Sequence, residues 1–370
     1  MAELVGLAMP GGPAFVDALR RTWDDGDAAL PIDPRLPGPA RDRLVIEMAP
    51  GVIIDDSADR RPIAGGRPVE AGDALVVATS GTSGEPKGVV LTHAAIDASA
   101  RATSARLQVD PDRDRWLACL PLSHVGGLSV VTRALVTGTP LEVLPRFDTD
   151  KVMAAARAGA TLVSLVATAL ARIDPGAFRT VLLGGARPPV AVPGNVVCTY
   201  GMTETGSGIV YDGRPLDGAE VRLDGAGVIE VRGPMLLRAY RDGTEPTDQD
   251  GWFSTGDVGR WAGDQLVVDG RRDDLIISGG ENVWPGPVEA VLGVRSDIVE
   301  VAVTGRDDRE WGQRVVAHLV VTDPAAPPSL DDLRTTVTEQ LPLWHAPKEI
   351  VLHRALPRLG SGKVSRADLR

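Results

Sequence analysis

The chain has 370 residues, a formal net charge of −11 and a mean hydropathy of zero. This length exceeds one ordinary core, so we expect about two domains of ~100–250 residues each. The acidic balance argues against nucleic acid or an anionic membrane as the main partner, although a local site can still bind a small anion. The N-terminal stretch lacks a basic region, and the longest apolar run, at 161–170, has about half the ~20 residues that span a bilayer. We therefore expect a cytoplasmic protein without membrane insertion.

Cysteine and lysine are both scarce. Cys119 and Cys198 lie in apolar runs, which favours reduced, buried thiols over a disulfide. Lysine occurs only at positions 87, 151, 348 and 363, whereas arginine is abundant. The compact ammonium of lysine and the planar guanidinium of arginine are not interchangeable where the cation must contact one or two oxygens in a tight space. Lys87 and Lys363, which lie in glycine-rich stretches, are therefore candidates for a functional role.

Residues 74–200 alternate between strand-like and helix-like segments. Such alternation predicts a layered α/β domain with largely buried strands. We expect strands at 74–80, 88–92, 116–122, 141–144, 161–166, 180–185 and 196–200, and helices at 93–108, 125–138 and 148–160, the last capped by Asp148 or Thr149.

The second part of the chain has a different pattern. Residues 219–270 favour antiparallel strands with a glycine-centred hairpin at 219–233. Beyond 270–274 we expect a small α+β module, with a boundary near Asp273 and hence domains at 1–272 and 273–370. Ser329 and Asp332 have capping-box spacing at the start of a helix. The module's expected strands are 274–278, 298–305, 314–321 and 347–353, and its expected helices are 285–293 and 329–341.

A stretch rich in glycine and hydroxyl residues separates the first two strands, at 79–87. It does not have the Walker spacing, because β-branched residues follow the lysine. Glycines let several backbone N–H groups face one anion, and hydroxyls add donors, so we expect a polyphosphate site; a plain flexible loop is the alternative. The candidate ligands are Thr79, Ser80, Gly81, Thr82, Ser83, Gly84 and Lys87.

This loop, TSGTSGEPKGVVLTH, resembles the phosphate-loop signature of the adenylate-forming superfamily. Four further stretches match signatures of the same superfamily in the same order: TYGMTETG, GWFSTGDVG, GRRDDLIISGGENVWPGPVE and LPRLGSGKVSR. The resemblance covers the chain from about 75 to the end. It implies an enzyme that joins a carboxylate to ATP, giving an acyl-adenylate and diphosphate, and then transfers the acyl group to a thiol. ATP, Mg²⁺ and CoA are the implied cofactor and co-substrates.

The resemblance also implies roles for individual residues. In TYGMTE, Tyr200 would stack near adenine with Gly201 and Met202 beside it, Thr203 would contact the α-phosphate, and Glu204 would bind Mg²⁺. The remaining implied nucleotide-binding residues are Asp257 and Arg271 at the ribose, with Arg272 as the alternative arginine, and Gly184, Gly185 and Ala186 in a loop between adenine and the acid.

The C-terminal motif implies a moving part. Lys363 is placed like the lysine that swings into the site and drives adenylation, although its position near the C-terminus is also typical of a frayed tail. Asp273 is placed like the hinge residue. Rotation there would withdraw Lys363 and bring in Gly279 and Gly280, which would line a narrow channel for CoA.

The amino-acid sequences of several motifs are most similar to those of the o-succinylbenzoate–CoA ligases of menaquinone biosynthesis. Relative to that family, an early N-terminal subdomain is expected to be missing. A CoA ligase for another aryl or short acyl acid, a stand-alone adenylation domain and a non-catalytic nucleotide-binding protein remain as alternatives, and the family implies a homodimer. The implied acid-binding residues are His124 beside the reacting carboxylate, and Arg133, Ser164, Thr168 and Ser207 as candidates for the second carboxylate.

Overall fold

The computed structural model describes residues 2–57, 59–80, 86–186, 191–358 and 364–370. It forms two compact units, one of residues 1–221 with 231–254, the other of residues 222–230 with 255–370. The boundary that we expect at Asp273 concerns a hinge movement and stays a prediction. Among the described helices, none is long and apolar enough to cross a membrane.

The first of two seven-stranded sheets in the larger unit combines parallel and antiparallel strands. Its order is β16-β6-β5-β2-β1-β3-β4. The central strands are parallel, whereas β6 returns antiparallel beside β5 and carries β16 on its outer edge. The strands are β1 (Leu4–Ala8), β2 (Ala28–Pro31), β3 (Val52–Asp55), β4 (Arg60–Pro62), β5 (Asp73–Ser80), β6 (Pro86–Thr92) and β16 (Ala239–Tyr240).

The second sheet has the order β13-β12-β11-β10-β9-β7-β8. Strands β8, β7, β9, β10 and β11 run parallel, and β12 and β13 add an antiparallel edge. Its strands are β7 (Trp116–Ala118), β8 (Leu141–Val143), β9 (Leu162–Leu165), β10 (Thr180–Leu183), β11 (Val196–Met202), β12 (Ser207–Tyr211) and β13 (Arg214–Pro215).

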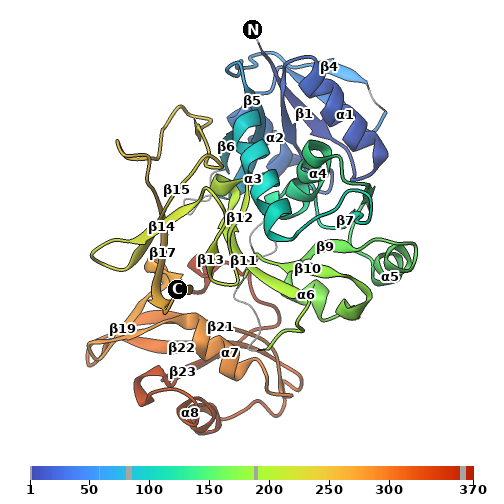
Figure 1. Ribbon diagram of the computed structural model, residues 1–370. Coiled ribbons are helices and arrows are strands. Elements are labelled where there is room, and N and C mark those ends of the chain that lie inside the picture. The colour runs from blue at the N-terminus through green and yellow to red at the C-terminus, as the bar shows by residue number, and fades with distance from the viewer. Residues whose placement is uncertain (1, 58, 81–85, 187–190, 359–363) are drawn as a thin grey trace. The chain divides into compact units, whose positions relative to one another are not determined.

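Helices join the two sheets into layers. α3 packs on β5 and β6, α4 packs on β7, β9 and β12, and the two helices contact each other (Figure 1). Thr92 caps α3 and Asp148 caps α5 through side-chain hydrogen bonds, as serine, threonine and aspartate do at helix starts. The layered α/β prediction is thus confirmed. The helices are α1 (Pro13–Asp24), α2 (Gly38–Met48), α3 (His93–Arg106), α4 (Val125–Thr137), α5 (Thr149–Arg157) and α6 (Ala167–Leu170).

The smaller unit contains a five-stranded sheet with two helices on one face. Val288 and Leu292 of α7 and Leu333 and Val337 of α8 share one apolar core with the sheet. Ser329 and Asp332 form the expected capping box. Its elements are β19 (Ile276–Ser278), β20 (Glu281–Val283), α7 (Pro285–Leu292), β21 (Ile298–Asp308), β22 (Gly312–Val321), α8 (Leu330–Thr338) and β23 (Glu349–Leu352).

A third sheet of four strands belongs mostly to the same unit. Its order is β14-β15-β17-β18. The hairpin that we expect at 219–233 is present, because the Asp224 N–H donates to the Val228 carbonyl at 2.9 Å between β14 and β15. The strands are β14 (Glu220–Leu223), β15 (Val228–Arg232), β17 (Phe253–Ala262) and β18 (Gln265–Arg271).

The two cysteines are free, as expected. Cys119 is buried, and burial raises the pKa of its thiol to about 12. Cys198 is only half-buried, so the expectation of two buried thiols is wrong in that detail. Within β11 only Val196 is buried, and Cys198 lies in the half-buried stretch that follows it.

A buried histidine, His318, which contacts the half-buried His353 in the smaller unit, predicts a pH dependence of stability. His318 lies on β22, with Nε2 2.9 Å from Thr304 Oγ1 and Nδ1 3.0 Å from His353 Nε2. Burial, with a contribution from His353, lowers the pKa of His318 to about 4. Since the unfolded imidazole titrates near 6.5, the unfolded state binds more protons between these values, and stability is lost as the pH falls.

We therefore expect the free energy of unfolding to drop by on the order of 2 kcal/mol between pH 7 and pH 4.5 through this group. Urea unfolding of the wild type and of His318→Gln at both pH values measures it. The glutamine variant keeps hydrogen-bonding capacity but cannot titrate, so its stability should change less with pH. An identical pH dependence in both proteins would contradict the assignment.

Candidate active site

Expected site residues gather at the carboxyl ends of parallel strands in the second sheet. Tyr200 lies near the end of β11, Gly184 directly follows β10, and Thr168 follows β9 in α6. His124 follows β7 and occupies the N-cap position of α4. Neighbouring parallel strands end at one edge of a sheet, where ligands bind in open α/β folds. Ser164, by contrast, lies within β9 and is half-buried.

Two glycines at the ends of β10 and β11 lie too close to neighbouring atoms to carry a side chain. A Cβ atom on Gly201 would lie 2.2 Å from the Ser207 carbonyl oxygen, where the β11–β12 register shifts. A Cβ on Gly184 would lie 2.8 Å from Thr199 Oγ1. Gly185 has φ +85°, in the region that glycine adopts without strain. The sequence places glycine here so that the loops can turn tightly after β10 and β11.

A single turn of 3₁₀ helix presents Thr203 and Glu204. Thr205 is fully buried, and its hydroxyl accepts the Met202 N–H at 3.0 Å and lies 2.6 Å from the Ser207 carbonyl oxygen. The two hydrogen bonds of the buried Thr205 hydroxyl therefore hold the turn in place. Thr203 and Glu204 remain half-buried at the surface of the turn.

The loop that we expect to bind a polyphosphate connects the antiparallel strands β5 and β6. Thr79 pairs with Lys87 and Ser80 with Pro86 in the antiparallel register, and Thr79 Oγ1 lies 3.4 Å from the Lys87 carbonyl oxygen. The hairpin therefore fixes both ends of the loop. The other expected phosphate ligands, Gly81, Thr82, Ser83 and Gly84, lie outside the described residues.

Tyr240 connects the expected phosphate lysine to the expected metal ligand. The Lys87 ammonium lies 5.3 Å from the centre of the Tyr240 ring. The Tyr240 hydroxyl donates to Glu204 Oε1 at 3.1 Å. Lys87 and Glu204, which are far apart in sequence, therefore belong to one site in the larger unit. Sequence reasoning missed Tyr240, because nothing in its local pattern marks it.

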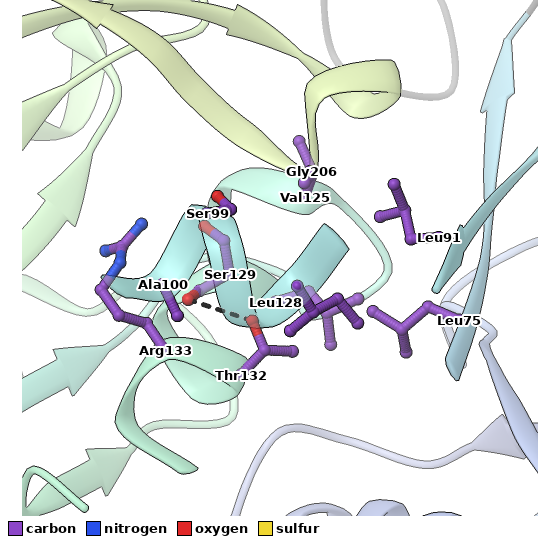
Figure 2. A pocket seen from close by; sticks show the side chains of 11 residues that line it. Leu75, Leu91, Ser99, Ala100, Val125, Leu128, Ser129, Thr132, Arg133 and Gly206 are labelled. Atoms are coloured by element: carbon purple, nitrogen blue, oxygen red, sulfur yellow. Dashed lines mark hydrogen bonds between the residues drawn. The ribbon is translucent and has the colours of Figure 1, made fainter. Parts of the chain in front are cut away.

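Arg133 and Ser207 also come together in the larger unit. Arg133 is 1% exposed, lies 4.8 Å from the Trp116 ring centre, and donates from Nη2 to Ser207 Oγ at 3.0 Å. Its Nε and Nη1 atoms have no hydrogen-bond partner in the described part of the chain, and burial lowers the pKa of the guanidinium. Ser129 and Thr132 of α4 line the same small cavity of about 10 Å³, roughly the room that one water molecule needs (Figure 2).

The expected ribose residues pair in the smaller unit. Asp257 on β17 is directly opposite Arg271 on β18, and Arg271 Nε lies 3.2 Å from Asp257 Oδ1. Arg271 also donates to the Thr255 carbonyl at 2.5 Å. Arg272, the alternative arginine, begins the short turn Arg272–Asp274 and is exposed. The geometry groups Asp257 with Arg271; the ribose role itself stays a prediction.

The glycines expected to line a CoA channel form a hairpin turn beside an open groove. Gly279 and Gly280 have φ +64° and +83° between β19 and β20, and both line the groove. Trp311 lines it too, and its carbonyl accepts the Gly279 N–H at 2.8 Å. The Lys348 ammonium lies 4.5 Å from the Trp311 ring centre. Neither Trp311 nor Lys348 was predicted from the sequence.

The expected hinge and the end of the chain are connected by arginines. Arg370 donates to the Asp273 carbonyl at 2.9 Å and to Asp274 at 3.0 Å. Arg366 donates to both Glu289 carboxylate oxygens at 2.7 and 2.8 Å. These contacts hold the chain after residue 363 on the smaller unit. Lys363 itself lies outside the described residues.

No cluster of three or more metal-ligating side chains occurs within the part of the chain that the structure describes. Glu204 fits Mg²⁺ nevertheless, because this hard cation binds proteins through one or two carboxylates and keeps several waters or phosphate oxygens. The half-buried Glu204 carboxylate, which accepts a hydrogen bond from Tyr240, would supply such a ligand.

Comparison with known families agrees with this arrangement. The family described as "AMP-binding enzyme" matches residues 62–240, and "AMP-binding enzyme C-terminal domain" matches residues 287–363. The fold and its motifs are thus those of AMP-binding enzymes. A probable 2-succinylbenzoate–CoA ligase of Mycobacterium tuberculosis is 41% identical over 392 residues, covering 98% of this chain and 97% of that protein. The chain belongs to the family of 2-succinylbenzoate–CoA ligases.

Further relatives extend the comparison. The 2-succinylbenzoate–CoA ligase of Bacillus cytotoxicus is 36% identical, over 80% of this chain and 69% of that protein. The o-succinylbenzoate CoA synthetase of Bacillus subtilis in complex with the acyl-adenylate OSB-AMP has a TM-score of 0.88 at 28% identity, covering 100% of this chain and 88% of that one. The same enzyme with ATP and magnesium ion has a TM-score of 0.87 at 29% identity, with 99% and 89% covered.

Proposed function

We propose that the protein is an acid–thiol ligase that joins 2-succinylbenzoate to CoA at the expense of ATP, through an acyl-adenylate, as a step of menaquinone biosynthesis. The observation that carries the reaction class is the site in the larger unit, where Lys87 and Glu204 meet through Tyr240. The identity of the acid is supported by the near full-length likeness to 2-succinylbenzoate–CoA ligases.

The first half-reaction needs charge neutralisation and alignment more than a protein nucleophile. A carboxylate oxygen of the acid attacks the α-phosphorus of ATP, and the bond to the diphosphate oxygen breaks. Both reactants are anionic, so cations and fixed N–H donors at the phosphates should supply most of the catalysis. Lys87 brings an exposed ammonium beside the phosphate hairpin, and Thr203 brings a hydroxyl that would contact the α-phosphate.

Glu204 would hold Mg²⁺, which supplies positive charge to the phosphate oxygens when bound. The carboxylate itself is oriented by the Tyr240 hydroxyl. Asp257 and Arg271 would bind the ribose, and Tyr200 and the loop at 184–186 would contact adenine.

The second half-reaction would use the smaller unit. The thiol sulfur of CoA attacks the acyl carbon, loses its proton to solvent, and displaces AMP. Gly279 and Gly280 would admit the thiol arm of CoA, because their groove lacks side chains at the turn. A rotation at Asp273 would withdraw Lys363, which serves adenylation, from the site and bring this groove to it.

Arg133 would act on the second carboxylate of the acid through Ser207. The cavity beside Arg133 has room for about one water and not for a substrate. Because Arg133 donates to Ser207 Oγ, the Ser207 hydroxyl proton is left to donate to an incoming carboxylate. His124 and Thr168 would line the same acid pocket. We place the enzyme in the cytoplasm and expect a homodimer, as the family resemblance implies.

A panel of acids tests the substrate assignment. With ATP, Mg²⁺ and CoA, we expect kcat/KM for 2-succinylbenzoate to exceed that for benzoate and for short acyl acids by about 10³-fold or more, since a site built for a buried carboxylate leaves its donors unpaired with other acids. A coupled assay of AMP release measures it, and mass spectrometry of the thioester confirms the product. Equal use of benzoate would contradict the assignment. AMP release without CoA consumption would instead indicate an adenylation domain.

A further inference from the structure

Tyr240 lies where it can contact both charged groups of the proposed phosphate site. On β16 it is directly opposite Val89 of β6. Lys87 lies two residues before Val89 and therefore on the same face of the sheet, within reach of a long or aromatic side chain. On its other side, the Leu237 N–H donates to the Glu204 carbonyl at 2.8 Å, which fixes the Glu204 turn next to β16.

The two contacts of Tyr240 use different parts of the side chain. The Lys87 ammonium lies 5.3 Å from the centre of the Tyr240 ring, within the ~6 Å range of a cation–π contact. The hydroxyl donates to the Glu204 carboxylate at 3.1 Å. The ammonium and the carboxylate both contact this one side chain, and their opposite charges attract each other. Among the described residues, no ion pair is found between Lys87 and Glu204, and each side chain contacts Tyr240 instead.

A direct pair would harm both groups. Lys87 in a salt bridge would present less positive charge to a polyphosphate, and Glu204 would present less negative charge to a divalent cation. Asp242 is a second carboxylate that attracts Lys87. Hydrogen bonds from Thr244 are the main cause that lowers the pKa of Asp242, and the nearby Lys87 charge lowers it further.

We propose that Tyr240 is a positioning residue that holds Lys87 and Glu204 apart, so that the ammonium stays available to the phosphates of ATP and the carboxylate to Mg²⁺. The proposal rests on the proposed use of ATP and does not depend on which acid is activated. The phenol suits this task because its ring attracts a cation while its hydroxyl binds an anion.

Two substitutions separate the two contacts. Tyr240→Phe keeps the ring and removes the hydroxyl, so the Mg²⁺ concentration for half-maximal diphosphate–ATP exchange should rise about 3–10-fold with little change in kcat. Tyr240→Leu removes both contacts, so the Kd of MgATP, measured by isothermal titration without acid, should rise about 10–30-fold. The Kd of AMP, which lacks the β- and γ-phosphates, should stay within about 2-fold in both variants.

Tyr211→Phe is the matched control. Tyr211 is buried and its hydroxyl lies 3.1 Å from Thr103 Oγ1, so the variant also loses one tyrosine hydrogen bond. It should bind MgATP and AMP like the wild type.

Wild-type MgATP binding in both Tyr240 variants would overturn the proposal, as would a parallel loss of AMP affinity and Tm, which would indicate a purely structural role. A wild type that binds MgATP but exchanges diphosphate with no acid would overturn only the proposed function; one that binds no MgATP would overturn both.

Discussion

Replacing Lys363 with alanine is expected to reduce adenylate formation by about 10²–10³-fold or more, while thioester formation from a supplied acyl-adenylate is spared. The ammonium would bridge the acid carboxylate and the α-phosphate only while the first bond forms, and loss of one such donor typically has this cost. Diphosphate–ATP exchange measures the first half-reaction, and CoA consumption with synthetic acyl-adenylate measures the second.

Lys151→Ala is a suitable control for that experiment. Lys151 lies exposed in the first turn of α5, so its loss should leave both half-reactions unchanged. Equal losses in both half-reactions of Lys363→Ala would count against a lysine that serves only adenylation, and with it against a hinge at Asp273.

Glu204→Gln should lower kcat for adenylation by about 10²–10³-fold and raise the Mg²⁺ requirement. The amide keeps the shape of the side chain and can still accept from Tyr240, but it has no charge for the metal. The Kd of ATP measured without Mg²⁺ should change little, because that complex does not use the metal ligand. Steady-state kinetics across a Mg²⁺ series, with ATP titrations in EDTA, separate these effects.

Glu220→Gln provides the comparison for that variant. Glu220 forms a solvent-exposed pair with Arg232 at 2.7 Å, and such pairs contribute little to stability. The Glu220→Gln variant should have the same kcat for adenylation and the same Mg²⁺ requirement as the wild type. If Glu204→Gln retained full activity at low Mg²⁺, the assignment of Glu204 as the metal ligand would be wrong.

Most of the secondary structure from 74 onwards could be predicted, because periodicity and caps are local. The buried strand at 180–183 and the capping box at Ser329 and Asp332 are examples. The first 55 residues were harder. There, β1 and β2 pair in parallel across the helix α1. Glycine and proline at 10–13 and Gly26 mark the two ends of that helix, but such local signals do not show which strands pair.

The candidate site was predicted residue by residue but not contact by contact. Motif likeness identifies Lys87, Glu204, Arg133 and Ser207, but it does not reveal that the first two meet through Tyr240 or that the last two hydrogen-bond each other. Such contacts arise from sheet pairing between segments that are distant in the sequence. The pairing of β16 with β6, which places Tyr240, leaves no periodic signal in a strand of two residues.

The most direct test of the account is exchange of labelled diphosphate into ATP by the purified protein. With 2-succinylbenzoate and Mg²⁺ present, we predict rapid exchange that needs no CoA and disappears when either the acid or the metal is left out. Absence of exchange with 2-succinylbenzoate and with every other acid of the panel would contradict the claim that this site joins a carboxylate to adenylate.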